Sequence, residues 1–288
     1  MGAPTYRFGR NWQDFLANYL TPERLAEAKA SIAEFCGPDA CRGRRVVDVG
    51  CGSGLFSLAA HELGAARLLS FDVDADSVAC CQSLWSRAGR PPTWEVRHGS
   101  VLDGAFVEGL GQYDLVYAWG VLHHTGRMWE ALGRTAELVA PGGSLHLALY
   151  NRATGWRLYP DGRIGPSTFW AWEKRTYVRL PRVLQAAVDG AAMGTMVAGY
   201  LLTGHHPGRQ IAAHRRRRGM AWSVDIRDWL GGYPYEYASV AEVTAAVEHL
   251  GLVVERVRAP GGLLNNEFRC RRPAVLVRVS PGSALVKP

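Results

Sequence analysis

Short apolar segments alternate with amphipathic helical segments between residues 45 and 150. Repeated units of one strand and one helix build a parallel sheet that is covered by helices on both faces. We therefore predict an α/β fold with a doubly wound, mostly parallel sheet and a ligand site at the carboxyl ends of its strands. The strands are expected at residues 45–49, 67–71, 93–97, 113–119 and 144–150, with a turn at 141–143.

The alternation stops after residue 151 and resumes at residue 239, where Ser239 and Glu242 have the spacing of a capping box. Helical periodicity also covers residues 11 to 35, with a new helix starting near Pro22. Residues 252–257 are predicted to form a strand, and residues 267–270 together with 274–279 are predicted to form one or two more. The predicted parts are an N-terminal helical cap (1–42), a core (43–151 and 238–288) and an inserted substrate or lid region (152–237).

Composition bounds the class of protein. The 288 residues suffice for one elaborated domain, or for a core with a large insertion. The 33 basic against 26 acidic residues give a net charge of +7, a mild bias that favours an anionic substrate without indicating nucleic-acid binding. The six cysteines form no CxxC pair, so we expect free thiols and no metal site. The polar N-terminus has no signal-peptide core, and the expected location is cytoplasmic.

The segment VVDVGCGSG, residues 46 to 54, is the most informative motif. Its glycines allow the backbone to approach a ligand closely, and the next helix begins there with free N–H groups. Asp72 follows at the end of the second strand, where a carboxylate can bind both ribose hydroxyls. The glycine spacing is GxGxG, whereas the dinucleotide fingerprint requires GxGxxG. The motif therefore predicts an adenosine-containing cofactor.

This pattern resembles the class I methyltransferase family, whose first motif reads DxGxGxG. The resemblance extends in the family's order to HGSVLD (98–103), YDLVYAWGVLHH (113–124) and LVAPGGSLHLAL (138–149). It implies a Rossmann-like, seven-stranded sheet and the cofactor S-adenosylmethionine (SAM).

The resemblance also implies the cofactor contacts. Asp48 and the loop from Gly50 to Gly54 would hold the methionine moiety, and Asp72 the ribose. The segment from Ser100 to Asp103 would line the adenine, although many members carry an acidic residue where Ser100 stands. Trp119 and Gly120 would lie near the sulfonium. The complete expected set is Asp48, Gly50, Cys51, Gly52, Gly54, Asp72, Val73, Ser100, Val101, Asp103, Trp119 and Gly120.

Candidates for acid–base chemistry are His124 and Glu173. His123 and His124 follow the fourth strand, and a histidine has a pKa suited to a general base. Both could instead be structural residues. Glu173 lies in the aromatic stretch WAWEKRTY, where burial would raise its pKa, although an ion pair on an exposed helix face is the alternative.

The insertion supplies the candidate substrate contacts. Trp170 and Trp222 belong to its many aromatic residues, which could line an acceptor pocket or form the core of a helical cap. Arg217 and Arg218 end a basic run that could bind phosphate or carboxylate, or be a solvated face. The apolar segment 183–203 contains Asp189, which favours a buried or lid helix over a membrane span; weak attachment to a membrane surface stays open.

The sequence therefore predicts a SAM-dependent methyltransferase that acts on a small molecule. An amphipathic acceptor with an anionic end, such as a prenyl diphosphate, would use both the aromatic residues and the arginines. The alternatives are an RNA-modifying methyltransferase and a SAM-binding protein with non-methylation chemistry. The methylated atom and the oligomeric state are not specified by these patterns.

Overall fold

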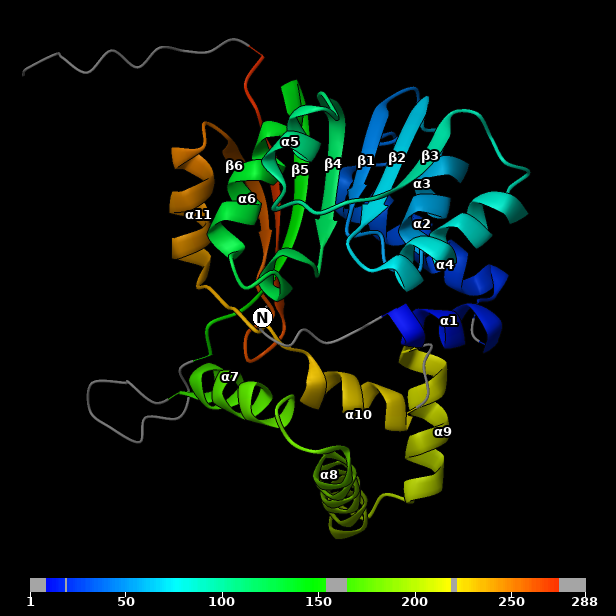
Figure 1. Cartoon of the computed structure of the whole chain (residues 1–288), viewed down its shortest axis with the longest axis vertical. Helices are drawn as coiled ribbons and strands as arrows, with labels where there is room; N and C mark the ends of the chain where they lie inside the picture. The colour runs from blue at the N-terminus through cyan, green and yellow to red at the C-terminus, as the bar shows by residue number, and fades with distance from the viewer. Residues whose placement is uncertain (1–8, 19, 154–164, 219–221, 275–288) are drawn as a thin grey trace, which may run out of the picture.

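One seven-stranded sheet organises the computed structural model, which describes residues 9–18, 20–153, 165–218 and 222–274 (Figure 1). Its strands are β1 (Arg45–Val49), β2 (Arg67–Asp72), β3 (Trp94–His98), β4 (Tyr113–Trp119), β5 (Val139–Tyr150), β6 (Val253–Arg258) and β7 (Asn265–Arg271). Their order is β3-β2-β1-β4-β5-β7-β6. Only β7 runs antiparallel to its neighbours, so the predicted mostly parallel α/β sheet is confirmed.

Helices cover both faces of the sheet. The helices of the described residues, on these faces and elsewhere, are α1 (Gly9–Asn18), α2 (Pro22–Cys36), α3 (Leu55–Glu62), α4 (Ala75–Arg87), α5 (Gly104–Glu108), α6 (Met128–Glu137), α7 (Pro166–Tyr177), α8 (Arg182–Leu202), α9 (Pro207–Arg218), α10 (Trp222–Gly231) and α11 (Val240–His249), with a short 3₁₀ helix η1 (Leu122–His124). Ser239 and Glu242 form the predicted capping box at the start of α11. Thr21 caps α2, whose first residue is Pro22.

Alternate residues of each strand face two separate apolar layers. Val46 packs with α1 to α4 on one face, and Val47 packs with α5, α6 and α11 on the other. Both side chains are almost fully buried. This arrangement explains why the central strands β1, β2 and β4 are mostly apolar, as expected for strands buried on both faces.

The chain before β5 differs from the prediction. The turn expected at residues 141–143 is part of β5, which begins at Val139 and carries an irregularity opposite Tyr113. A Cβ on Gly143 would lie 2.9 Å from the carbonyl oxygens of Ala140 and Tyr113, so close backbone packing, rather than a turn, requires this glycine. Of the expected segment 274–279, residues 275–279 lie outside the described residues.

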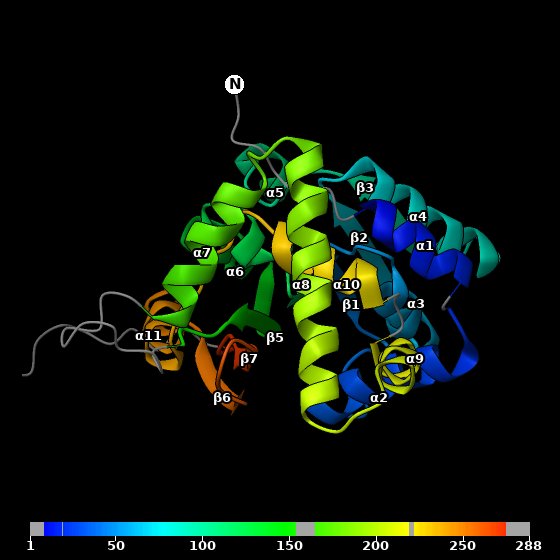
Figure 2. The same cartoon turned by 90° about the horizontal axis from the view of Figure 1, so that it is seen from below.

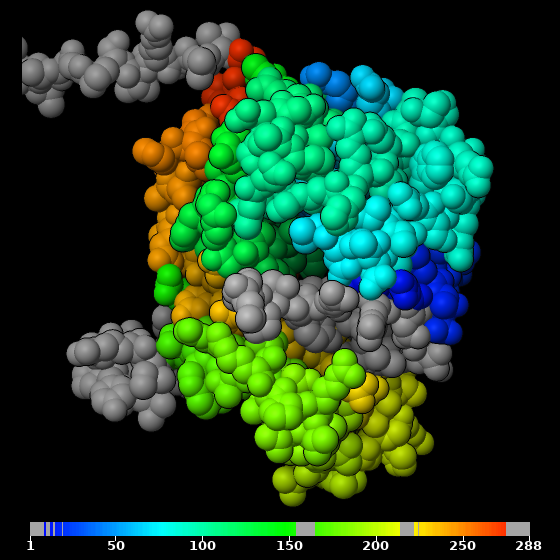
Figure 3. Space-filling view, viewed as in Figure 1, coloured from blue at the N-terminus to red at the C-terminus, as the bar shows by residue number. Residues whose placement is uncertain are grey.

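The helices α7 to α10 lie between β5 and α11 in the chain and pack beneath the carboxyl ends of the parallel strands (Figures 1 and 2). In the space-filling view they form the lower part of the molecule (Figure 3). Tyr177, Trp222, Ile226 and Leu230 form a small hydrophobic core of their own. The insertion is therefore a packed helical unit at the edge where a ligand is expected.

The apolar segment 183–203 corresponds to α8. Its Asp189 is buried, accepts a hydrogen bond from the Tyr177 hydroxyl at 2.7 Å, and pairs with Arg227 at 3.3 Å. Among the described helices, none has both the length and the hydropathy of a bilayer-spanning segment. Val183 and Leu202, near the two ends of α8, are strongly exposed.

Candidate functional site

The glycine loop joins β1 to α3 in a backbone conformation that favours glycine. Gly50, Gly52 and Gly54 have φ values of +67°, +52° and +80°. A Cβ on Gly50 would lie 2.4 Å from Val121, and one on Gly54 would lie 2.8 Å from the Cα of Cys81. Two of the three glycines are thus required by packing against neighbouring segments as well as by the turn itself.

Asp72 lies at the end of β2 beside this loop. Its Oδ2 accepts a hydrogen bond from the Gly52 N–H at 3.0 Å, and its Oδ1 accepts one from the Asp74 N–H at 2.9 Å. Burial raises the pKa of the carboxyl group. Since a carboxylate offers about four lone-pair sites, acceptor capacity remains for the ribose hydroxyls of SAM.

Asp48 lies beneath the loop and has a structural contact that the resemblance did not indicate. Its Oδ2 accepts a hydrogen bond from the Ser57 hydroxyl at 2.5 Å. Ser57 in turn accepts one from Ser70 at 2.7 Å, and Ser70 accepts one from the Trp94 indole at 2.9 Å. Burial raises the pKa of Asp48 to about 7. This chain fixes the position of the loop relative to α3 and β3.

The raised pKa of Asp48 predicts a pH-dependent cost in the unliganded protein. Between pH 4 and 7 the folded state retains a proton that the unfolded state releases, so the free energy of unfolding falls as pH rises. Relative to an Asp48→Asn variant, wild type should lose up to about 1.4 kcal/mol per pH unit across this window. Urea unfolding at several pH values measures the difference. A flat difference would contradict the buried, protonated carboxyl; the exposed Asp39→Asn variant controls for loss of a surface charge.

The remaining expected cofactor residues lie along the same edge. Val73 and Trp119 are 66% and 40% exposed, which is unusual for large apolar side chains next to a buried sheet. A Cβ on Gly120 would meet no atom of the described residues within 4 Å. Val101 is buried, and Asp103 caps α5 by accepting a hydrogen bond from the Phe106 N–H at 3.2 Å. The glycine loop, the Asp72 carboxylate and this exposed apolar edge fit SAM. The presence of Asp103 is explained by its role as a helix cap, without a contact to the cofactor.

Helix α1 adds a residue that the sequence analysis missed as a site residue. The indole Nε1 of Trp12 lies 3.1 Å from the position of a Cβ on Gly52. The helix is anchored there because the N–H of Gly9 donates to the Asp74 carboxylate at 3.2 Å. In sequence, Trp12 was only one apolar position of a helix, and nothing in its spacing indicated contact with a loop forty residues away.

Aromatic side chains from the core and the insertion meet at the carboxyl edge. We call them the aromatic cluster; its members are His123, His124, Tyr150, Trp170, Trp229 and Tyr235. Tyr150 is central, with ring centroids 4.0 Å from His123, 4.9 Å from Tyr235 and 6.2 Å from Trp229. Trp170 lies 5.3 Å from Trp229. The cluster joins the end of β5 and η1 to α7 and α10.

One of the two histidines of the cluster, His124, is held by a backbone group. The Nδ1 of His124 lies 2.8 Å from the Pro234 carbonyl oxygen. Because a carbonyl oxygen can only accept a hydrogen bond, the Nδ1 carries the proton and donates it. Burial, the largest cause, and the charge of Lys174 together lower the pKa of His124 to about 4, although the hydrogen bond to Pro234 raises it. Burial also lowers the pKa of His123 well below its usual value. Both rings are therefore neutral at physiological pH.

Glu173 and Lys174 are neighbours on α7 and both face inward. Burial raises the pKa of Glu173 to about 7, and burial lowers the pKa of Lys174 to about 7. Neither the Oε2 of Glu173 nor the Nζ of Lys174 has a hydrogen-bond partner among the described residues. Of the two candidate bases, Glu173 has the pKa better matched to proton transfer near neutral pH.

One expected substrate residue, Trp222, lies outside the aromatic cluster. Trp222 lies in the hydrophobic core of the insertion with Tyr177 and Ile226, where it packs between helices. Arg217 and Arg218 are the last two residues of α9, but the structure does not describe their side chains. Among the expected substrate residues whose side chains are described, Trp170 is the one that belongs to the cluster.

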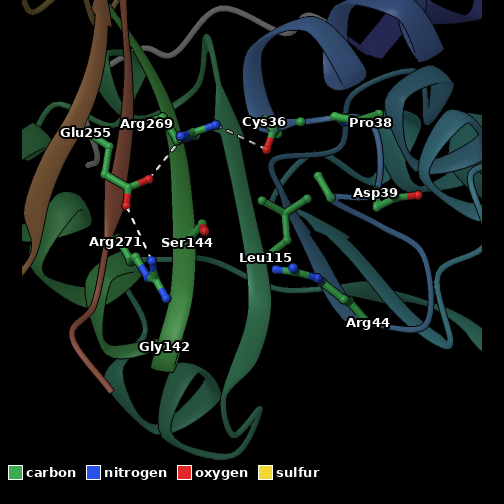
Figure 4. A pocket seen from close by; sticks show the side chains of 12 residues that line it. Cys36, Pro38, Asp39, Arg44, Leu115, Gly142, Ser144, Glu255, Arg269 and Arg271 are labelled. Atoms are coloured by element: carbon green, nitrogen blue, oxygen red, sulfur yellow. Dashed lines mark hydrogen bonds and ion pairs between the residues drawn. The ribbon is translucent and has the colours of Figure 1, made fainter. Parts of the chain in front are cut away.

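A separate cavity of about 330 Å³ lies at the amino ends of the strands, opposite the glycine loop (Figure 4). Glu255 pairs there with Arg269 at 3.2 Å and with Arg271 at 3.7 Å, and Arg269 also donates to the Cys36 carbonyl oxygen at 3.5 Å. The lining holds three arginines, Arg44, Arg269 and Arg271, against two carboxylates, Asp39 and Glu255. Within the described residues, no group of His, Cys, Asp and Glu side chains is arranged to hold a metal ion.

Comparison with known proteins agrees with this geometry. A family model described as a methyltransferase domain matches residues 47–145. The ubiquinone biosynthesis O-methyltransferase of Xanthomonas campestris pv. campestris is 32% identical over 184 residues, which cover 57% of this chain and 72% of that protein. An uncharacterised protein of Synechococcus sp. is 31% identical over 118 residues, which cover 38% of this chain but only 28% of that longer protein.

The fold is shared with a solved structure. Magnesium protoporphyrin IX methyltransferase of Synechocystis PCC 6803, with bound S-adenosylhomocysteine, matches 91% of this chain and 93% of its own, with 12% identity and a TM-score of 0.53. Fold and loop together define a Rossmann-like enzyme with an adenosyl cofactor. The chain belongs to the class I family of SAM-dependent methyltransferases, and its cofactor is SAM.

Proposed function

We propose that this enzyme methylates a hydroxyl oxygen of a small aromatic molecule that binds against the aromatic cluster. The observation that carries this proposal is the cluster itself, which joins the end of β5 and η1 to helices α7 and α10 of the insertion. Rings of this kind favour a planar acceptor through stacked and edge-on contacts. The Xanthomonas relative is an O-methyltransferase, which supports oxygen as the methylated atom.

The residues of the site then have simple tasks. When bound, SAM supplies an activated methyl group, so the protein must mainly orient the acceptor and remove the proton of its hydroxyl. We assign proton removal to Glu173, because its pKa of about 7 suits a general base. His124, whose Nδ1 is held by Pro234, is the second candidate. The rings of Trp170 and Trp229 would hold the acceptor.

Some of the detailed predictions from the sequence, on the acceptor, the SAM contacts and the location, are carried into this proposal. The acceptor is proposed to be acidic, but a prenyl diphosphate has less support, because it depends on Arg217 and Arg218, whose side chains are outside the described residues. We also propose that Asp48, the glycine loop, Asp72 and the edge at Val73, Trp119 and Gly120 bind SAM. A cytoplasmic location remains our expectation.

Replacing Trp229 by alanine tests the proposal. Transfer of labelled methyl from SAM to a panel of phenols, including catechol and 4-hydroxybenzoate, identifies an acceptor for wild type. Loss of one stacked ring costs about 0.5–1.5 kcal/mol, so Trp229→Ala should raise the KM for that acceptor about three- to ten-fold. The Kd for SAM, measured by calorimetry, should be unchanged.

Trp172→Ala is the matched control, since Trp172 is on α7 but 63% exposed. It should leave both KM and Kd near wild type. Methyl transfer to no phenol, or transfer to RNA instead, would contradict the proposed function.

A further inference from the structure

Lys174 is a buried lysine on α7. Only 1% of its surface is exposed, and its Nζ has no hydrogen-bond partner among the described residues. Lysine is rarely fully buried unless its charge is paired, and its long side chain usually reaches solvent. The next residue on α7, Arg175, is exposed, so the helix does offer solvent-facing positions. The burial of Lys174 thus needs an explanation.

Three aromatic rings surround the ammonium group. Its Nζ lies 4.2 Å from the ring centroid of Trp229, 5.3 Å from that of Tyr235 and 5.8 Å from that of Trp170. Ring faces attract a cation, but they leave its three N–H donors without a conventional acceptor. The ionisable groups that interact with it electrostatically are Glu173 on α7, Asp228 on α10 and His124 on η1.

Other polar atoms near the cluster are also without partners. They include the Oε2 of Glu173 and the Nδ1 of His123. Buried polar groups are almost always hydrogen-bonded, and an exception requires a specific reason. His123, Glu173, Lys174 and Tyr235 are the exceptions near the proposed acceptor site, and a bound polar molecule is the simplest common reason for these four. Tyr117 and Arg272 are exceptions elsewhere in the described residues.

We propose that the ammonium of Lys174 binds an acidic oxygen on the ring of the acceptor, while Trp229 and Tyr235 pack against that ring. This inference rests on the proposed function and names the substrate class, an aromatic molecule with a phenolate or a carboxylate oxygen. One positive charge among rings matches a planar monoanion. It does not match a diphosphate, which carries more negative charge than one lysine can pair with.

Binding of small nitroaromatic probes tests this role without turnover. The protein is saturated with S-adenosylhomocysteine, and binding of 4-nitrophenol, 4-nitrobenzoate and the neutral 4-nitroanisole is measured through quenching of tryptophan fluorescence. Wild type should bind at least one of the two acids about ten-fold more tightly than 4-nitroanisole, as expected for a charge-assisted hydrogen bond. If 4-nitrophenol is that probe, its yellow anion should also increase on binding below the pKa of the free probe.

Lys174→Met retains the length of the side chain and removes the charge. It should lose about ten-fold in affinity for the preferred acid, bind 4-nitroanisole as wild type does, and abolish any increase in the yellow anion. Lys174→Arg should restore most of the affinity, and Arg175→Met, which removes an exposed charge from the same helix, should have no effect. Dependence on Lys174 for 4-nitrobenzoate alone would identify the oxygen as a carboxylate.

Several outcomes would overturn the inference. They are equal binding of acids and 4-nitroanisole by wild type, unchanged affinity in Lys174→Met, or an equal loss in Arg175→Met. The wild-type comparison decides the matter even if Lys174→Met does not fold.

The proposed function can fail separately. Lysine-dependent binding of an acid without methyl transfer to any phenol would leave Lys174 as an anion site in an enzyme with another acceptor. Methyl transfer to a phenol without such binding would retain the function and reject the role of Lys174.

Discussion

Gly54→Ala should destabilise the protein by about 2–5 kcal/mol, because the new methyl group has no room. Its Cβ would lie 2.8 Å from the Cα of Cys81, a backbone atom of α4 that cannot move without displacing the helix. Overpacking of this kind costs about 1–3 kcal/mol. The φ of +80° adds about 1–2 kcal/mol for any residue with a Cβ. Urea unfolding of the unliganded protein measures the sum.

Gly89→Ala separates the two contributions. Gly89 has a similar φ of +86°, but a Cβ there would meet no atom within 4 Å. This variant should lose only the backbone share, about 1–2 kcal/mol. Equal losses in the two variants would show that backbone strain alone fixes Gly54, and that α3 and α4 are not in close contact at the loop.

Asp72→Ala should weaken SAM binding by at least ten-fold and up to about a hundred-fold. A hydrogen bond to a charged group contributes about 1.5–3 kcal/mol, and the ribose offers two hydroxyls to this carboxylate. The variant also removes the acceptor of the Gly52 and Asp74 N–H groups, so the loop itself loses support. Calorimetric titration with SAM provides the affinity.

Two controls make the result specific. Asp103→Ala removes a carboxylate near the expected adenine side, where its observed contact is a helix cap, and should have a much smaller effect. The Asp72→Ala variant must retain a cooperative unfolding transition. Wild-type affinity in a folded Asp72→Ala protein would contradict the assignment of the ribose site.

The core of the fold was predictable because its signals are local. The central parallel strands are mostly apolar runs, and a polar residue or a glycine marks their ends, as Asp72 does within β2 and Gly50 does after β1. Such patterns depend on neighbours in the chain. The segment from 141 to 143 misled the prediction because Gly143 is required by the approach of Tyr113, a contact that only the folded sheet creates.

The site was predictable only where a motif carried it. The glycine loop and Asp72 were identified, whereas Trp12 reaches the loop from a distant helix. Asp48 was assigned to the cofactor, but its hydrogen bond to Ser57 crosses the loop and has no signature in sequence.

On α7 the sequence analysis identified Glu173 as a candidate site residue and did not identify its neighbour, Lys174. The missed signal was helical phase. Trp170, Lys174 and Tyr177 are spaced as one face of a helix, so a lysine occupies a position on the apolar side. A charged residue at such a position is either a snorkelling side chain or a functional group, and only the structure distinguishes these cases.

A crystal structure with bound S-adenosylhomocysteine tests the central claim most directly. We expect the ribose hydroxyls to bind Asp72 and the homocysteine to lie beside the loop from Gly50 to Gly54. We also expect the sulfur to face Tyr150 and the aromatic cluster. A sulfur that faces away from the cluster, or a ligand bound at another edge of the sheet, would contradict it.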